Sequence, residues 1–177
     1  RFFFIFSWME NNRVFPAMNQ WFFNQIKFNN YTLDVDSSVI TRYGSQEGSL
    51  RGYNPTKRGR SSHHPLFAFV SELRMVANCW LRSGNTASAS NCLRFLEETF
   101  QIFKGKTIGL FRADSGFASN IIFEYLEKEN VPYVIAGRMH AVIQQKIKDI
   151  KNWIAIGEGV WIAEIEYKAG QWNKTRR

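Results

Sequence analysis

The order of the apolar patterns along the chain limits its fold more than any other feature of the sequence. Residues 31–36 alternate apolar with polar side chains, which is the period-two pattern of a strand with one buried face. Apolar runs at residues 66–70 and 75–81 fit two further strands. Strand patterns and helix patterns then alternate along the rest of the chain. Leading strands followed by such alternation predict an α/β fold with a mixed sheet.

The alternating half begins after a polar turn at residues 82–85. Apolar residues recur at helical spacing over residues 89–103, and Thr86 or Ser88 is available to cap that helix. The segments predicted from there on are a helix ending near residue 103, a strand at 106–111, a helix at 118–129, a strand at 133–136, a helix at 140–150, and a hairpin of 153–156 with 160–167.

Three parts of the chain follow from these patterns. Residues 1–30, rich in Phe and Asn, form a lead-in that we expect to dock on the remainder. Residues 31–150 form the α/β core, and residues 151–177 hold the hairpin. Within the core, we expect helices on both faces of the sheet. We also expect residues 37–43 to pair back on the first strand.

Composition is that of a chain that folds around a core. Its 177 residues suit about one domain, and apolar residues at 45% with aromatics at 16% exclude a disordered chain. No apolar run approaches the ~20 residues of a membrane span, so we expect no membrane partner. Cys79 and Cys92 form neither a disulfide framework nor a zinc pattern, which favours reduced thiols in the cytoplasm. The net charge of +8 favours a polyanionic partner.

Two carboxylates stand where strands end. Asp36 closes the first predicted strand, and Asp114 closes the strand after the first long helix. Ligands of open α/β sheets bind outside the carboxyl ends of strands, and paired carboxylates there suit Mg²⁺. Asp34 shares a face with Asp36 and is a second candidate, although Asp36 lies nearer the strand end. Ordinary roles for these residues as caps or turns remain open on spacing alone.

A basic segment lies between the first strands. Arg51, Lys57, Arg58 and Arg60 occur there without an acidic residue among them, and they are candidates to track a DNA phosphate backbone. A solvated loop with no ligand explains the same pattern. The adjacent histidines at 63–64 point in different directions on any regular element, so structural roles are favoured over a shared metal.

Several sequence blocks resemble one family, the DDE transposases of bacterial insertion sequences, specifically transposase DDE domain group 1. The blocks occur in the order of that family. They are LDVDS at 33–37, QEG at 46–48, GYNP at 52–55, SHHPL at 62–66, LRSGN at 81–85, RADSGF at 112–117 and YVI at 133–135. The resemblance covers about residues 31–177.

The resemblance implies a ribonuclease-H-like catalytic core, present in part over residues 31–150, with the start of a β-rich insertion at residues 151–177. It also implies an Asp-Asp-Glu triad that binds Mg²⁺ or Mn²⁺, in which Asp36 matches the first acid and Asp114 the second. No residue matches the third, a helical Glu expected after the insertion. The glutamates at 158, 164 and 166 fall in the predicted hairpin rather than on a helix.

Two functions are compatible with the resemblance. The first is a fragment of a DDE transposase that cleaves DNA and transfers strands during transposition, inactive alone because the third acid is absent. The alternative is a catalytically inactive DNA-binding remnant. In either case the expected partner is DNA, at transposon ends and at target sites. The expected location is the bacterial cytoplasm, at the nucleoid when acting, with a homodimer as one option for the parent protein.

Overall fold

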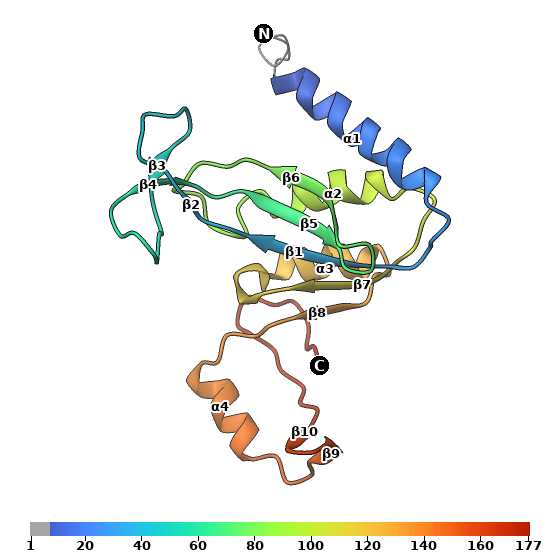
Figure 1. Ribbon diagram of the computed structural model, residues 1–177. Coiled ribbons are helices and arrows are strands. Elements are labelled where there is room, and N and C mark those ends of the chain that lie inside the picture. The colour runs from blue at the N-terminus through green and yellow to red at the C-terminus, as the bar shows by residue number, and fades with distance from the viewer. Residues whose placement is uncertain (1–7) are drawn as a thin grey trace. The chain divides into compact units, whose positions relative to one another are not determined.

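The computed structural model describes residues 8–177, with side chains from residue 13 onward. The chain forms two compact units, one extending to Ala136 and one covering Gly137–Arg177 (Figure 1). The elements of the first unit are α1 (Trp8–Gln25), β1 (Tyr31–Ser37), β2 (Ile40–Thr41), β3 (Leu50–Arg51), β4 (Ser61–His63), β5 (Leu66–Val70), β6 (Met75–Trp80), α2 (Cys92–Ile102), β7 (Ile108–Ala113), α3 (Asn120–Lys128) and β8 (Tyr133–Ile135).

The main sheet of the first unit has five strands in the order β6-β5-β1-β7-β8. Strand β1 pairs antiparallel with β5 on one side and parallel with β7 on the other, and β8 continues the parallel half. The predicted mixed sheet with an antiparallel half is therefore confirmed. Strand β1 is central, so its carboxyl end lies between β5 and β7, two strands that are distant from it in sequence.

The core lies on one face of this sheet, because the alternation in β1 separates apolar from polar side chains. Leu33 and Val35 are buried, whereas Asp36 on the opposite face is exposed. Apolar residues of α2 and α3, including Phe95 and Leu126, belong to the same buried cluster as the strand residues. This cluster holds the central strands in place by excluding their apolar side chains from water.

Both long helices of the core cover the same face, so the prediction of helices on both faces is wrong for the residues described. Strands β6, β7 and β8 run in the same direction, and the chain moves from β6 to β7 to β8 without reversing across the sheet. Right-handed crossovers in one direction place successive helices on one face. The other face carries the exposed side chains of Phe69, Val76 and Val134.

Helix α1 forms within the predicted lead-in, and its aromatic residues explain how it docks. The Phe23 ring is buried, and its centroid lies 5.0 Å from that of Phe103 and 6.2 Å from that of Tyr31. Asn19 donates a hydrogen bond to the carbonyl of Ala77 on β6. The first seven residues of the lead-in lie outside the described part of the chain.

Residues 40–63 form a small separate sheet, which we call the finger, with strand order β2-β4-β3. The expectation that residues 37–43 pair back on the first strand is wrong, since β2 pairs with β4 and β5 occupies the neighbouring place beside β1. Close approach of the backbone explains why Gly52 is needed in the finger. A Cβ there would lie 2.0 Å from the carbonyl oxygen of Gly84.

Helix α2 begins at Cys92, later than the predicted caps Thr86 and Ser88 allow. Asn91 precedes it with a left-handed φ of 57°, and residues 88–91 form turns instead of a first helical turn. The cap prediction is wrong because both residues contact distant parts of the chain instead. The hydroxyl of Ser88 lies 2.9 Å from that of Ser37, and the carbonyl of Thr86 lies 2.9 Å from Nδ1 of His64.

The second unit contains α4 (Ala141–Lys148) and a two-stranded sheet of β9 (Ile154–Gly157) with β10 (Val160–Ile162). The predicted hairpin is confirmed, but β10 ends five residues before Tyr167, which instead bridges to Arg176. The three-part division of the chain proposed from sequence stays a prediction. Among the described residues, no helix combines the length and apolar character needed to cross a bilayer.

Candidate functional site

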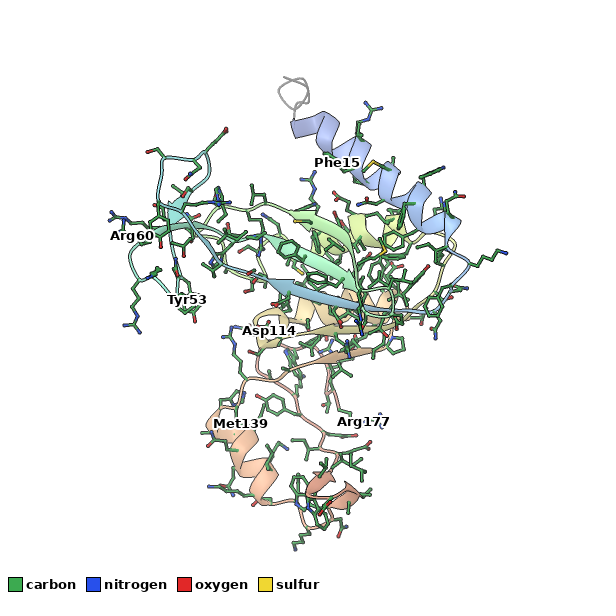
Figure 2. The ribbon with its side chains drawn as sticks, viewed as in Figure 1. Phe15, Tyr53, Arg60, Asp114, Met139 and Arg177 are labelled. Carbon is green, nitrogen blue, oxygen red and sulfur yellow. The ribbon has the colours of Figure 1, made fainter. Side chains whose placement is uncertain are left out.

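Asp36 and Asp114 occupy equivalent places at the ends of two adjacent parallel strands. Val35 of β1 is in register with Ala113 of β7; Asp36 is the next residue of β1, and Asp114 directly follows the end of β7. Because side chains alternate along a strand, both aspartates follow residues of the core-facing side and emerge on the open face. The structure thus brings the two predicted acids to neighbouring positions, and both are exposed. Figure 2 labels Asp114 of this pair.

Each of these carboxylates is oriented by a hydrogen bond from the backbone beyond it. Oδ1 of Asp36 accepts from the amide of Ser37 at 2.7 Å, and Oδ1 of Asp114 accepts from the amide of Gly116 at 2.8 Å. The second bond caps a single turn of 3₁₀ helix, Ser115–Phe117. Among the described residues, Oδ2 of each aspartate has no hydrogen-bond partner. One oxygen of each carboxylate is therefore fixed and the other is left for a ligand.

Asp34 has a different partner, which separates it from this pair. Arg112 on β7 donates from Nε to Asp34 Oδ1 at 2.5 Å and from Nη2 to Oδ2 at 2.7 Å, and Nη2 also donates to the hydroxyl of Ser71. Hydrogen bonding to Asp34 and its negative charge raise the pKa of Arg112. The ion pair occupies both oxygens of Asp34, whereas Asp36 keeps one carboxylate oxygen without a partner among the described residues.

A buried arginine organises the loop that follows β6. Arg82 donates from Nε to the carbonyl of His64 at 3.0 Å, and its Nη1 contacts the carbonyls of Ala87, Ser88 and Ser90 at 3.3, 3.0 and 2.9 Å. Burial lowers the pKa of this guanidinium. The hydrogen bonds from Arg82 to these carbonyls compensate for the loss of water around its charge. They also fix the turns that precede α2.

The loop held by Arg82 reaches the two strand ends. The hydroxyls of Ser88 and Ser37 lie 2.9 Å apart, and Ser37 directly follows Asp36. On the other strand, a Cβ added at Gly116 would lie 3.0 Å from Cβ of Ser88. Ser88 therefore packs beside both carboxylate-bearing turns. Sequence reasoning missed this role of Arg82 and Ser88, and the LRSGN block at residues 81–85 was the only signal that pointed to the region.

The two adjacent histidines have separate structural roles, as predicted. Both are buried. Nδ1 of His63 accepts from Nε of Arg42 at 3.1 Å, while its Nε2 lies 2.9 Å from the carbonyl of Glu47. The ring of His64 bridges the carbonyls of Thr86 and Tyr53 at 2.9 and 2.8 Å. The His63 contacts lie within the finger, whereas those of His64 tie the finger to the loop after β6.

The four predicted DNA-binding cations lie in the finger. Arg51 is on β3, and the other three precede β4 in the β3–β4 loop. All four are exposed. Arg60 lies over the ring of Tyr43, 5.6 Å from its centroid, whereas the side chains of Arg51, Lys57 and Arg58 form no ion pair within the described chain. The structure thus gathers the cations on one element that begins four residues after Asp36.

No third acid joins the pair in the part of the chain that the structure describes, where no group of three or more potential metal ligands occurs. The hairpin glutamates belong to the second unit. Glu158 lies in the turn between β9 and β10, and Glu164 forms an exposed ion pair with Arg177 at 3.4 Å. Neither lies on a helix, as the sequence had indicated.

Comparison with protein families gives a match over nearly the whole chain. The model described as transposase DDE domain group 1 matches residues 10–177. A search of the curated proteins found no match. Among solved structures, a piggyBac transposase synaptic complex with hairpin DNA matches at a TM-score of 0.50 and 15% identity, covering 75% of this chain and 29% of that chain.

Two structures of Mos1 transposase also match. The paired-end complex with the left transposon end has a TM-score of 0.44 and 12% identity, covering 80% of this chain and 53% of that chain. The catalytic domain alone has a TM-score of 0.42 and 11% identity, covering 81% of this chain and 73% of that chain. The ribonuclease-H-like mixed α/β fold expected from sequence is confirmed by the strand order described above together with the piggyBac match.

Proposed function

The chain belongs to the transposase DDE domain group 1 family, and from this membership we propose that it is part of the catalytic region of a DDE transposase that cleaves DNA and transfers strands. The chain spans 29% of the piggyBac transposase chain and 53% of the Mos1 chain that it matches. The activity proposed is therefore that of the parent protein to which these residues contribute.

One observation carries the proposal: Asp36 and Asp114 follow residues that are paired in register on adjacent parallel strands. Each carboxylate has one oxygen held by a backbone amide and one without a partner in the described chain. Hard divalent cations such as Mg²⁺ prefer this kind of oxygen donor, so the residues fit a Mg²⁺ or Mn²⁺ site. Such an ion would stabilise charge on a phosphodiester during in-line attack.

The remaining residues of the site would act as supports. Arg112 neutralises Asp34, which keeps a third negative charge from adding to the repulsion between Asp36 and Asp114. Arg82 and Ser88 fix the loop against which both carboxylate turns pack. The exposed cations Arg51, Lys57, Arg58 and Arg60 would bind phosphates of the DNA.

A nicking assay on end-labelled DNA from the ends of the parent element tests this function. We expect metal-dependent nicking by the chain extended with the sequence downstream of Arg177, and no nicking by residues 1–177, because the described residues supply two acids rather than three. Asp36→Asn or Asp114→Asn should abolish nicking by the extended chain. Asp149→Asn, which removes an exposed carboxylate at the end of α4, is the matched control and should leave it unchanged.

The alternative, a DNA-binding remnant without chemistry, is favoured by the same absence of a third acid among the described residues. The assay separates the two functions. Binding of DNA by the extended chain without metal-dependent nicking would establish the remnant and contradict the enzyme. We further expect the parent protein to act at the nucleoid in the bacterial cytoplasm, with transposon ends and target DNA as its partners and a homodimer as one option for its assembly.

A further inference from the structure

The finger exposes an aromatic ring on a backbone that is firmly held. Tyr53 lies in the β3–β4 loop, and 75% of the residue is accessible to solvent (Figure 2). Its carbonyl is engaged by Nε2 of buried His64 at 2.8 Å. Exposure of the ring is therefore not the result of a loose loop, because the backbone atoms of the same residue are part of a buried contact.

The residues on both sides of Tyr53 are fixed as well. Gly52 packs backbone against backbone on Gly84. The side chain of Asn54 is buried, donating to the hydroxyl of Thr41 at 2.9 Å and accepting from the amide of Lys57 at 2.8 Å. These contacts connect residues 52–54 to Thr41, to Lys57 and to the loop after β6. The ring thus projects from a rigid support, which reduces the entropy that a ligand would have to remove on binding.

The ring of Tyr53 is open on both faces, in contrast to the other exposed tyrosine of the finger. Tyr43 is 74% accessible, but Arg60 lies over its ring at 5.6 Å from the centroid. Within the described chain, no cation or aromatic ring lies over Tyr53, and its hydroxyl forms no hydrogen bond. The Tyr53 ring is therefore available for stacking without displacing a protein group.

The segment of the chain that carries this ring is basic. No Asp or Glu occurs between Glu47 and Glu72, and Arg51, Lys57 and Arg58 are exposed cations of the same loop region. Cations that bind phosphates next to an aromatic ring that accepts a base are the combination found in proteins that bind unpaired nucleotides. A paired base inside a duplex exposes only its edges and cannot stack on a side chain in this way.

We propose that Tyr53 is the stacking platform for an unpaired nucleobase of DNA whose flanking phosphates are bound by the cations of the finger. This inference rests on the proposed function, which supplies the DNA, and adds the structural class of DNA that the site selects. The base would lie flat on the tyrosine ring, while Arg51, Lys57 and Arg58 neutralise the phosphates on either side. Every base has an aromatic face, so the site selects an unpaired base rather than a particular sequence.

The test compares two DNAs of the same sequence, one fully paired and one with a single extrahelical 2-aminopurine, by anisotropy and by 2-aminopurine quenching. We expect tighter binding of the DNA with the unpaired base, and quenching of its fluorescence on binding. Tyr53→Ala should remove that preference, by about five- to a hundredfold for the loss of one stacked base, and should also remove the quenching. Tyr53→Phe should keep both, because stacking requires the ring and not the hydroxyl.

Two control variants separate this inference from the proposed function. Tyr43→Ala removes an equally exposed ring whose one face already has Arg60 over it, and it should keep the preference. Replacing Arg51, Lys57, Arg58 and Arg60 by Ala should weaken binding of both DNAs and flatten its salt dependence, by about 0.9 in log–log slope for each phosphate that the variant no longer neutralises.

Equal affinity of the wild type for the two DNAs, or equal losses for both DNAs in Tyr53→Ala, would overturn the stacking role and leave the basic finger intact. Failure of the wild type to bind either DNA would overturn the proposed DNA interface, and the stacking role with it. A melting temperature of Tyr53→Ala near that of wild type is expected, since the exposed ring contributes no buried contact.

Discussion

Asp34 and Asp36 show how two chemically identical residues on one strand acquire different roles. They lie two residues apart on the same face of β1, but only Asp34 is opposite Arg112 in the parallel register. The bidentate contact uses both oxygens of Asp34. Asp36 lies two residues further along β1, where it makes no contact with Arg112 and is next to the position of Asp114. A single cross-strand pairing therefore decides which of the two carboxylates is taken up by an ion pair.

The reactivity of the two cysteines tests how the start of α2 packs against the core. Cys79 on β6 is exposed, whereas Cys92 at the start of α2 is buried. Burial raises the pKa of the Cys92 thiol to about 12, against a partial lowering by the charge of Arg82. Since the thiolate is the nucleophile, Cys92 should stay protonated and unreactive at pH 9, where a free thiol with a pKa of about 8.5 is mostly ionised.

We therefore expect a thiol reagent such as DTNB to modify one cysteine of the folded protein at pH 8 to 9, and both after unfolding in denaturant. Cys79→Ser should reduce the count in the folded protein to zero, and Cys92→Ser should leave it at one. Rapid modification of Cys92 in the folded protein would contradict the packing of the loop and of α2 described above.

At the level of elements, the finger and the loop after β6 are joined by direct contacts. The contacts between them run backbone to backbone at Gly84 and through the ring of His64, whose own carbonyl accepts from the buried guanidinium of Arg82. This explains why Gly and buried polar residues recur in segments that sequence patterns class as loops. A loop that carries so many fixed contacts acts as a rigid support for the residues next to it.

Substitution of Gly84 tests this joint directly. A Cβ at residue 84 would lie 2.2 Å from the carbonyl oxygen of Ser62 and 2.3 Å from that of Leu50, both backbone atoms that cannot move aside independently. We expect Gly84→Ala to lower the free energy of unfolding by about 1–3 kcal/mol or more, the cost typical of overpacking. Urea unfolding followed by circular dichroism measures it.

The matched control is Gly137→Ala, because no atom lies within 4 Å of a Cβ added at that position. Its free energy of unfolding should stay within about 0.5 kcal/mol of wild type, as is usual for surface substitutions. Equal stability of the Gly84 and Gly137 variants would show that the finger does not pack against the loop after β6 as described.

At the scale of the whole molecule, the sequence predicted those features that depend on local periodicity. The alternation in residues 31–36 identified the central strand, and the aspartates were found because they end strands. Three features could not be predicted in this way: the register of β1 on β7, the single covered face and the contacts of Arg82. The first two depend on residues far apart in sequence, and Arg82 also reaches the carbonyl of His64, 18 residues away. No local pattern reports which partner a strand or a buried arginine will meet.

The proposed function requires Asp36 and Asp114 to hold a divalent cation together, which an electron paramagnetic resonance titration of free Mn²⁺ measures. We expect the chain to bind Mn²⁺ weakly at one site, and Asp149→Asn to bind it equally. Asp36→Asn and Asp114→Asn should each weaken binding by at least about tenfold, since even loss of a group that supports a metal ligand costs about 10–100-fold. Unchanged Mn²⁺ affinity in both of these variants would contradict the proposal.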